Sequence, residues 1–304
     1  MKQAAALTAA LCLAAAAMAA PASAQDSAPA PYTPDSAWSL DYGDDYCRLA
    51  RSFSNDAGGE VALALERIQA GPLMRLILVG QGLSVYRSAQ DIGYRFLPEG
   101  ANMPPARFAR SQTAEGQVWL NLGSVSLMPL EFPAPGAEPE PFDRAAEQAA
   151  AGKVTGISFE GGLTTPITLE TGSLAQPIAA LQACADELLT HWKLDAAAHQ
   201  HMSRPAYPDG PMTGWLPTGT IGFGDFDKLA GSANEIRLMV DASGKVSDCQ
   251  VHWPSLGDTT NRRICESLTS KAQFKPALDA NGEPMASYFT TSPFFLLPPP
   301  PGAR

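Results

Sequence analysis

The fold is decided by residues 235–253, which read EIRLMVDASGKVSDCQVHW. Apolar and polar residues alternate on both sides of the DASG tetrapeptide, and this period of two is typical of half-buried strands. Gly244 is free to take the positive φ of a tight turn, so the stretch predicts a β-hairpin. The apolar spacing slips in the second strand, which predicts a bulge near Asp248.

The residues after this hairpin complete a small sheet. A polar run ending near Lys271 predicts a helix, with Asp258 or Thr259 as its N-cap. Asn281-Gly282 is a second turn signal, and residues 288–297 are rich in aromatic and β-branched side chains, which favours a last strand. The predicted order is strand, strand, helix, strand, with the helix packed on the sheet.

Upstream of this module, the sequence predicts a β-rich domain over residues 37–198. Short alternating or apolar runs between Gly and Pro residues indicate strands at 61–65, 73–79, 94–96, 107–110, 117–122 and 154–159. After Ser173, a good N-cap, apolar residues recur at helical spacing and predict a closing helix: Ile178, Leu181, Ala185, Leu188 and Trp192. Residues 129–141, rich in Pro, Ala and Glu, are expected to form a loop.

The chain is therefore expected to be an α+β protein of two domains, the second being a ββαβ unit over residues 215–304. Residues 1–24 have the pattern of a cleaved secretory signal, with an Ala-rich apolar core before the small-residue site Ala22-Ser-Ala24. Residues 25–36 then form a flexible leader, and residues 199–214, with three prolines, form a short linker between the domains. An uncleaved membrane anchor is the competing interpretation of residues 1–24.

The charge of the chain limits its partners. The net charge is −10, and loss of Lys2 with the signal makes the mature chain more acidic still. Phosphate groups repel such a protein, so binding to nucleic acid or to an anionic lipid surface is not expected. No apolar segment after residue 24 is long enough to cross a membrane, so the mature chain is expected to be soluble and periplasmic.

Four cysteines remain after the signal, and an even number in an exported protein favours two disulfides. Three pairings are possible from the sequence. Cys249 lies in a predicted strand and Cys265 in the next helix, so this pair closes a local loop, and Cys47 with Cys184 then ties the start of the first domain to its last helix. No Cys-x-x-Cys pair is present, so the cysteines suggest neither zinc binding nor redox catalysis.

The order of motifs in the last third of the chain resembles the C-terminal domain of the TonB family, a periplasmic module that transfers energy to outer-membrane receptors. Gly244-Lys-Val-Ser-Asp-Cys249, Phe274-Lys-Pro-Ala277 and Asp279-Ala-Asn-Gly282 match motifs of that family. Trp253-Pro-Ser-Leu-Gly257 and Asp258-Thr-Thr-Asn261 stand where the family has a Ser-Ser-Gly turn and a Leu-Asp helix start.

The resemblance implies a protein or peptide partner that adds as a strand beside the last strand, such as the plug or an exposed strand of a TonB-dependent outer-membrane receptor. The matching edge is residues 287–295, and the residues expected to contact the partner are Ser287, Tyr288, Phe289, Thr290, Thr291, Phe294 and Phe295. Pro293 within this edge has no N–H to donate. It therefore either shortens the pairing or bends the strand, and it can instead protect the edge from aggregation.

Two alternative functions stay open. A membrane-anchored energy transducer requires residues 1–24 to remain in the membrane, yet the chain has no His before His191, where the family's anchor helix carries one, and its linker is short. A periplasmic enzyme or metal binder would act through the first domain. Neither an enzyme nor a cofactor is expected, because the sequence has no Gly-x-Ser-x-Gly, phosphate-loop or dinucleotide motif.

Two polar clusters are assigned to the surface. His191, His199 and His201 lie close in sequence, but no Cys or paired carboxylate accompanies them at ligand spacing, so a solvated linker is expected rather than a metal site. The three aspartates of residues 41–45 do not have the alternating ligands of a calcium loop and are expected to form an acidic patch.

Overall fold

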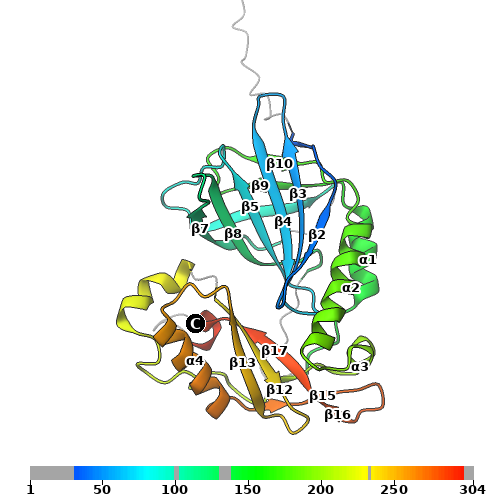
Figure 1. Cartoon of the computed structure of the whole chain (residues 1–304), viewed down its shortest axis with the longest axis vertical. Coiled ribbons are helices and arrows are strands. Elements are labelled where there is room, and N and C mark those ends of the chain that lie inside the picture. Colours follow the sequence, from blue (N-terminus) through cyan, green and yellow to red (C-terminus); the bar gives the residue numbers. More distant parts are fainter. Residues whose placement is uncertain (1–30, 99–102, 130–137, 232–233, 298–304) are drawn as a thin grey trace, which may run out of the picture.

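The computed structural model describes residues 31–98, 103–129, 138–231 and 234–297. Figure 1 shows two parts, a barrel-like sheet with helices along one side and, below it, a smaller sheet backed by one helix. The protein contains both helices and sheets and is rich in strands, as expected of an α+β fold. The expected signal, residues 1–24, and most of the expected leader lie outside the described residues.

Ten strands form the first sheet. Along the sheet they are ordered β1-β3-β4-β5-β8-β7-β6-β9-β10, and β2 also pairs with β3. Tyr32, next to β1, bridges to Leu169 of β10, and its N–H donates to the carbonyl oxygen of Thr168 at 2.8 Å, so the sheet is nearly closed. The strands are β1 (Thr33–Pro34), β2 (Ser39–Tyr42), β3 (Cys47–Ser54), β4 (Glu60–Arg67), β5 (Met74–Gly80), β6 (Asp91–Leu97), β7 (Ala106–Gln112), β8 (Val118–Val125), β9 (Gly156–Glu160) and β10 (Ile167–Leu169).

Hydrophobic periodicity explains which of these strands the sequence predicts. The six predicted strands are present as β4 to β9, and the apolar run at 73–79 is β5, which is buried on both faces between β4 and β8. β3 was missed, because Arg48 and Arg51 interrupt its apolar pattern. Helix α1 (Arg144–Lys153) was also missed, since its two buried residues, Glu147 and Ala151, carry no strong apolar signal.

The closing helix of the first part is α2 (Ala175–His191), which packs against the barrel-like sheet through Ile178, Leu181 and Leu188. The predicted N-cap, Ser173, lies one residue before the observed N-cap, which is Leu174. The hydroxyl oxygen of Ser173 still accepts the N–H of Ala175 at 3.3 Å. The Cys47–Cys184 disulfide joins α2 to β3, as expected. A one-turn helix, α3 (Ala196–Gln200), follows α2.

The second part has the predicted strand, strand, helix, strand order. The hairpin is β12 (Glu235–Val240) and β13 (Val246–His252), with Gly244 at φ 82° in the turn. The pairing register shifts between Met239 and Val240, which places the bulge next to Asp248 as predicted. Strand β17 (Ser287–Thr291) pairs with the other side of β12, so the sheet order is β13-β12-β17.

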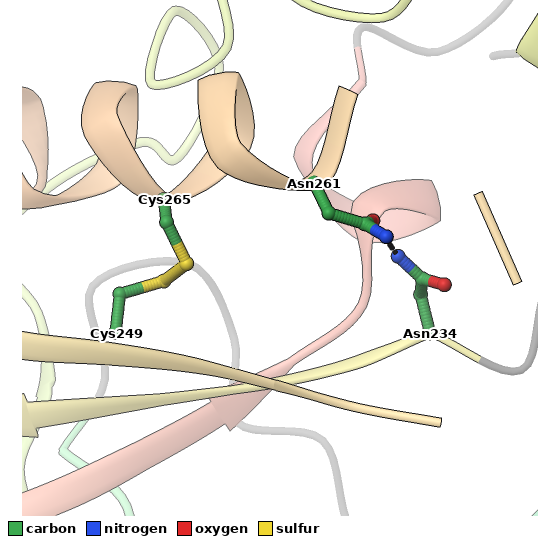
Figure 2. The surroundings of a disulfide bond; sticks show 4 residues. All are labelled: Asn234, Cys249, Asn261 and Cys265. Atoms are coloured by element: carbon green, nitrogen blue, oxygen red, sulfur yellow. Dashed lines mark hydrogen bonds between the residues drawn. A yellow bond between two sulfur atoms is a disulfide. The ribbon is translucent and has the colours of Figure 1, made fainter. Parts of the chain in front are cut away.

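Helix α4 (Asp258–Lys271) covers one face of this sheet through Ile264 and Leu268, which are fully buried. Figure 2 shows how it is attached: the Cys249–Cys265 disulfide crosses from β13, and the side chains of Asn234 and Asn261 are hydrogen-bonded. The predicted cap was wrong, because Gly257 is the N-cap and its N–H is accepted by the carboxylate of Asp225.

The final strand is shorter than predicted. β17 ends at Thr291, and the short 3₁₀ helix η2 (Pro293–Leu296) begins at Pro293, whose fixed φ and missing N–H suit the first turn of a helix. Phe294 and Phe295 of the predicted edge therefore lie in η2, not on a strand.

The expected linker, residues 199–214, is partly folded onto the second part. Ala206 belongs to the core of that part, and β11 (Tyr207–Pro208) pairs with β14 (Phe274–Lys275). The remaining short elements of the second part are η1 (Phe223–Gly231), β15 (Ala277–Leu278) and β16 (Pro284–Met285). Among the described residues, no helix combines the length and the apolar character that crossing a membrane requires.

Candidate functional site

The predicted partner-binding edge is located on β17, at one end of the small sheet. Ser287 to Thr291 pair with Val240 to Ile236 of β12, and within the described residues no further strand pairs with the outer side of β17. Side chains alternate along a strand. Phe289 accordingly points toward the helix-covered core, where its ring lies 5.0 Å from that of Phe274, whereas Tyr288 and Thr290 point to the opposite face.

Most of that opposite face packs on the barrel-like part of the molecule instead of facing solvent. Its residues come from all three strands, and Gln250 alone among them is exposed: Glu235, Arg237, Met239, Gln250, His252, Tyr288 and Thr290. Thr290 donates a hydrogen bond from Oγ1 to Oε1 of Gln69 in the loop between β4 and β5, at 2.7 Å. We call this contact region the domain interface.

Arg237 is the main contact at the α2 end of the domain interface. Its Nη2 donates to Oδ1 of Asp45 at 2.8 Å, and its guanidinium carbon lies 3.9 Å from the centre of the Trp192 ring, within range of a cation–π interaction. Trp192 also donates from Nε1 to the same Asp45 oxygen at 3.3 Å, and its ring meets that of Tyr288 edge-on at 5.7 Å. Burial would raise the pKa of Asp45, but the hydrogen bond and charge of Arg237 outweigh it and lower the pKa.

Asp45 is one of the three aspartates expected on a surface acidic patch. Its side chain is still 30% exposed, but it also joins the two parts of the molecule, a role that the sequence did not predict. No local signal could have found this role, because Arg237 lies 192 residues away in the chain.

Glu66 is the centre of the other half of the domain interface. Its side chain is 0% exposed, and its carboxylate accepts from Nε and Nη2 of Arg48 at 2.9 and 2.6 Å and from Nε1 of Trp253 at 2.5 Å. Arg48 donates to Oε2 and Trp253 to Oε1, and Nε2 of His252 lies 3.3 Å from the same Oε1. Burial raises the pKa of Glu66, yet the hydrogen bond with His252 and the charge of Arg48 lower it overall.

Trp253 reaches Glu66 from an unusual backbone conformation, with φ at 51°. A bulky residue in the left-handed region is strained and persists only where its surroundings hold it. The surroundings here belong to the first domain, since Arg48 and Arg75 each lie 5.4 Å from the Trp253 ring. Arg75 also pairs with Glu235 at 3.2 Å, and although 21% of the Glu235 side chain is exposed, burial of its carboxyl raises its pKa.

A cleft of about 390 Å³ opens beside the start of β17. Its walls come from the end of α2 and the residues after it, from β12 and β13, and from the start of β17, and they include Trp192, Leu194, Met239, Asp248, Ala286 and Ser287. The volume is within the range of binding sites for small ligands or single side chains. The cleft therefore lies over β12 and β13, and of the predicted edge only Ser287 lines it.

The three histidines assigned to a solvated linker separate in the structure. His201 is exposed, but His199 on α3 is 6% exposed, so the expectation was wrong for His199. Its Nδ1 lies 2.7 Å from the carbonyl oxygen of Asp195, and its Nε2 lies 3.1 Å from Oγ of Ser287. Burial lowers the pKa of His199. Because Ser287 is only 2% exposed, this pair is a packing contact and not an accessible nucleophile.

Among the described residues, no group of three or more His, Cys, Asp or Glu side chains is arranged to hold a metal ion. No family model, no curated protein and no solved structure matches this chain.

Proposed function

We propose that this chain is a periplasmic, TonB-like interaction protein whose C-terminal domain binds an extended segment of an envelope protein by strand addition to β17. The observation that carries the proposal is the position of β17, which ends the sheet order β13-β12-β17. A strand at the end of a sheet has one row of backbone N–H and C=O groups that an added strand can satisfy.

The two ends of this sheet differ, and the difference favours β17. Strand β13 carries the bulge beside Asp248, and a bulge with a charged side chain interferes with regular pairing. β17 pairs with β12 without a register shift over all of its five residues. Its outer side is therefore the more regular template for a partner.

Two features support an exported, envelope location. The order of the Gly-x-Val-x-Asp-Cys, Phe-x-Pro-Ala and Asp-x-x-Gly motifs resembles the TonB C-terminal domain, and both disulfides suit an oxidising compartment. The partner we propose is an exposed strand or plug segment of an outer-membrane receptor. Pairing is limited to Ser287–Thr291, because η2 starts at Pro293.

The experiment is a titration of the isotope-labelled full chain with peptides taken from a phage-displayed random library. Peptides that add to β17 should shift the backbone amide signals of Ser287–Thr291 and leave those of β13 in place. The same peptide with alternate backbone nitrogens methylated is the matched control, since it cannot donate to the strand edge. Saturating peptide that shifts β13 or η1 signals but not β17 signals would reject the proposal.

A further inference from the structure

The outer edge of β17 is not free along its whole length, because His199 lies beside it. Ser287 and Tyr288 are consecutive, so their side chains point to opposite faces of the sheet. His199 nevertheless contacts both: its Nε2 is 3.1 Å from Ser287 Oγ, and its ring is stacked against the Tyr288 ring with centroids 6.2 Å apart and planes 16° apart.

A single ring reaches side chains on both faces from the open side of the strand or from around its first residue. The inner side of β17 is occupied by β12, where Val240 and Met239 pair with Ser287 and Tyr288. His199 therefore lies at the open side or at the start of the strand, around its first two residues. A strand that adds beside Ser287 and Tyr288 would need this space.

The hydrogen bonds of His199 fix the ring in this place. A carbonyl oxygen only accepts, so the contact with Asp195 assigns the proton to Nδ1, and the free Nε2 accepts from the hydroxyl of Ser287. The Tyr288 ring is itself in edge-on contact with Trp192, the residue that follows α2. The rings of Trp192, Tyr288 and His199 are thus in contact in this order, from the first domain to the start of β17.

The helix that carries His199 is itself buried through this residue alone, whereas the chain after it is anchored, since the N–H of Ser203 donates to the carbonyl oxygen of Leu278 at 3.0 Å. α3 has five residues, and His199 is its one buried residue. The Asp195 carboxylate caps it by accepting the N–H of Ala198 at 2.9 Å, and Gln200 donates to Asp186 at 2.8 Å, a contact that is exposed. A short helix held mainly by one side chain can leave the edge without unfolding either sheet.

We propose that α3 is an intramolecular cover of the partner-binding edge, held over Ser287 and Tyr288 by His199 and displaced when an extended partner segment pairs with β17. This proposal rests on the proposed function of that edge. It makes the short connection between the two domains the element that sets the affinity for the partner, because the partner must first displace α3.

The first test measures amide hydrogen exchange in the full chain and needs no partner. His199→Ala should raise the exchange rate of the outward-facing amides of Ser287–Thr291 about tenfold, the effect expected from losing one buried hydrogen bond and a ring contact. Ser287→Ala removes only the hydroxyl and should raise these rates by a smaller factor, about threefold. His201→Ala, an exposed histidine two residues further on, is the matched control and should change nothing. The amides of β13 report whether the whole domain has been weakened. Unchanged β17 exchange in His199→Ala would overturn the cover.

The second test uses a peptide selected from a random phage-displayed library on the His199→Ala protein. It should bind that variant about tenfold more tightly than wild type or His201→Ala. Equal affinity for all three proteins, with shifts on β17, would overturn the cover and keep the proposed function. If no peptide pairs with β17 in any of them, the proposed function fails, and the exchange measurement alone then decides whether His199 covers the edge.

Discussion

Replacing Glu66 by Gln removes the charge at the centre of the domain interface while keeping the size of the side chain. In the wild type, the fully buried carboxylate accepts from Arg48 in its own domain and from Trp253 in the other. Loss of one partner of a buried ion pair costs about 3–5 kcal/mol. Because Arg48 keeps 23% of its side chain exposed, water can solvate it in the variant, so we expect a loss of about 3 kcal/mol in the free energy of unfolding.

The part of this loss that concerns the domain interface can be measured with a double-mutant cycle. Trp253→Phe keeps an aromatic ring but removes the Nε1 donor that lies 2.5 Å from Glu66. Urea unfolding of the wild type, both single variants and the double variant should give a coupling energy of about 1.5 kcal/mol. Glu60→Gln, an exposed residue at the start of the same strand, is the control and should stay within about 0.5 kcal/mol of wild type.

Two results would refute this reasoning. A coupling energy below about 0.3 kcal/mol would mean that Glu66 and Trp253 act independently and that the interface is not held there. The pH dependence gives the second check. The folded-state pKa of Glu66 lies below 4.5, so its stabilisation is complete above 4.5 and is lost as the pH falls through the lowered value. Wild type and Glu66→Gln should therefore converge in acid, and a difference that persists there would contradict the assignment.

Three further predictions test other parts of the structure. Replacing both cysteines of the Cys47–Cys184 disulfide by alanine should lower the free energy of unfolding by about 5 kcal/mol, and the same change at Cys249–Cys265 by about 3 kcal/mol, because the first disulfide closes a much longer loop. Equal losses in urea unfolding would contradict this ordering. Gly244→Ala should lower the free energy of unfolding by more than about 2 kcal/mol, because a Cβ there would lie 2.0 Å from the carbonyl oxygen of Phe274. Gly116→Ala is the control: Gly116 has a similar φ but lies in open space, so the variant should lose about 1 kcal/mol. Thermal unfolding measures both losses. Burial lowers the pKa of His199, so the unfolded chain binds this proton first as the pH falls through 6.5 and the fold loses stability. The protection factors of the β17 amides, measured relative to their intrinsic exchange rates, should therefore fall between pH 7 and 5 in wild type and not in His199→Ala. A parallel pH response of the two proteins would exclude His199 as the cause.

Local patterns explain why so much of the second domain was predicted. Gly244 and the alternation around it define the hairpin, and Ile264 and Leu268 recur at helical spacing on α4. The same rules failed where the pattern ended. Residues after Thr291 remain apolar, so composition alone extended the strand through Pro293, although the chain turns into η2 there.

The domain interface lay beyond these rules for a different reason. Asp45 is hydrogen-bonded to Arg237, and Glu66 to Trp253, across separations of 192 and 187 residues. None of these four residues belongs to a motif, and a charged side chain on a strand is ordinarily read as facing solvent. Their contacts became visible only when the two sheets were placed against each other.

The sequence by itself determined part of the elements: alternation defined the longer strands apart from β3, helical spacing defined α2 and α4, and the cysteine positions favoured the two disulfides that the structure contains. Only the tertiary structure decided what the edge of β17 faces. Periodicity reports which side of an element is buried, because the apolar residues of that side recur every two to four positions along the sequence. It carries no information on which distant residue lies beside a strand, and so the histidine expected in a solvated linker is found buried in contact with Ser287 and Tyr288.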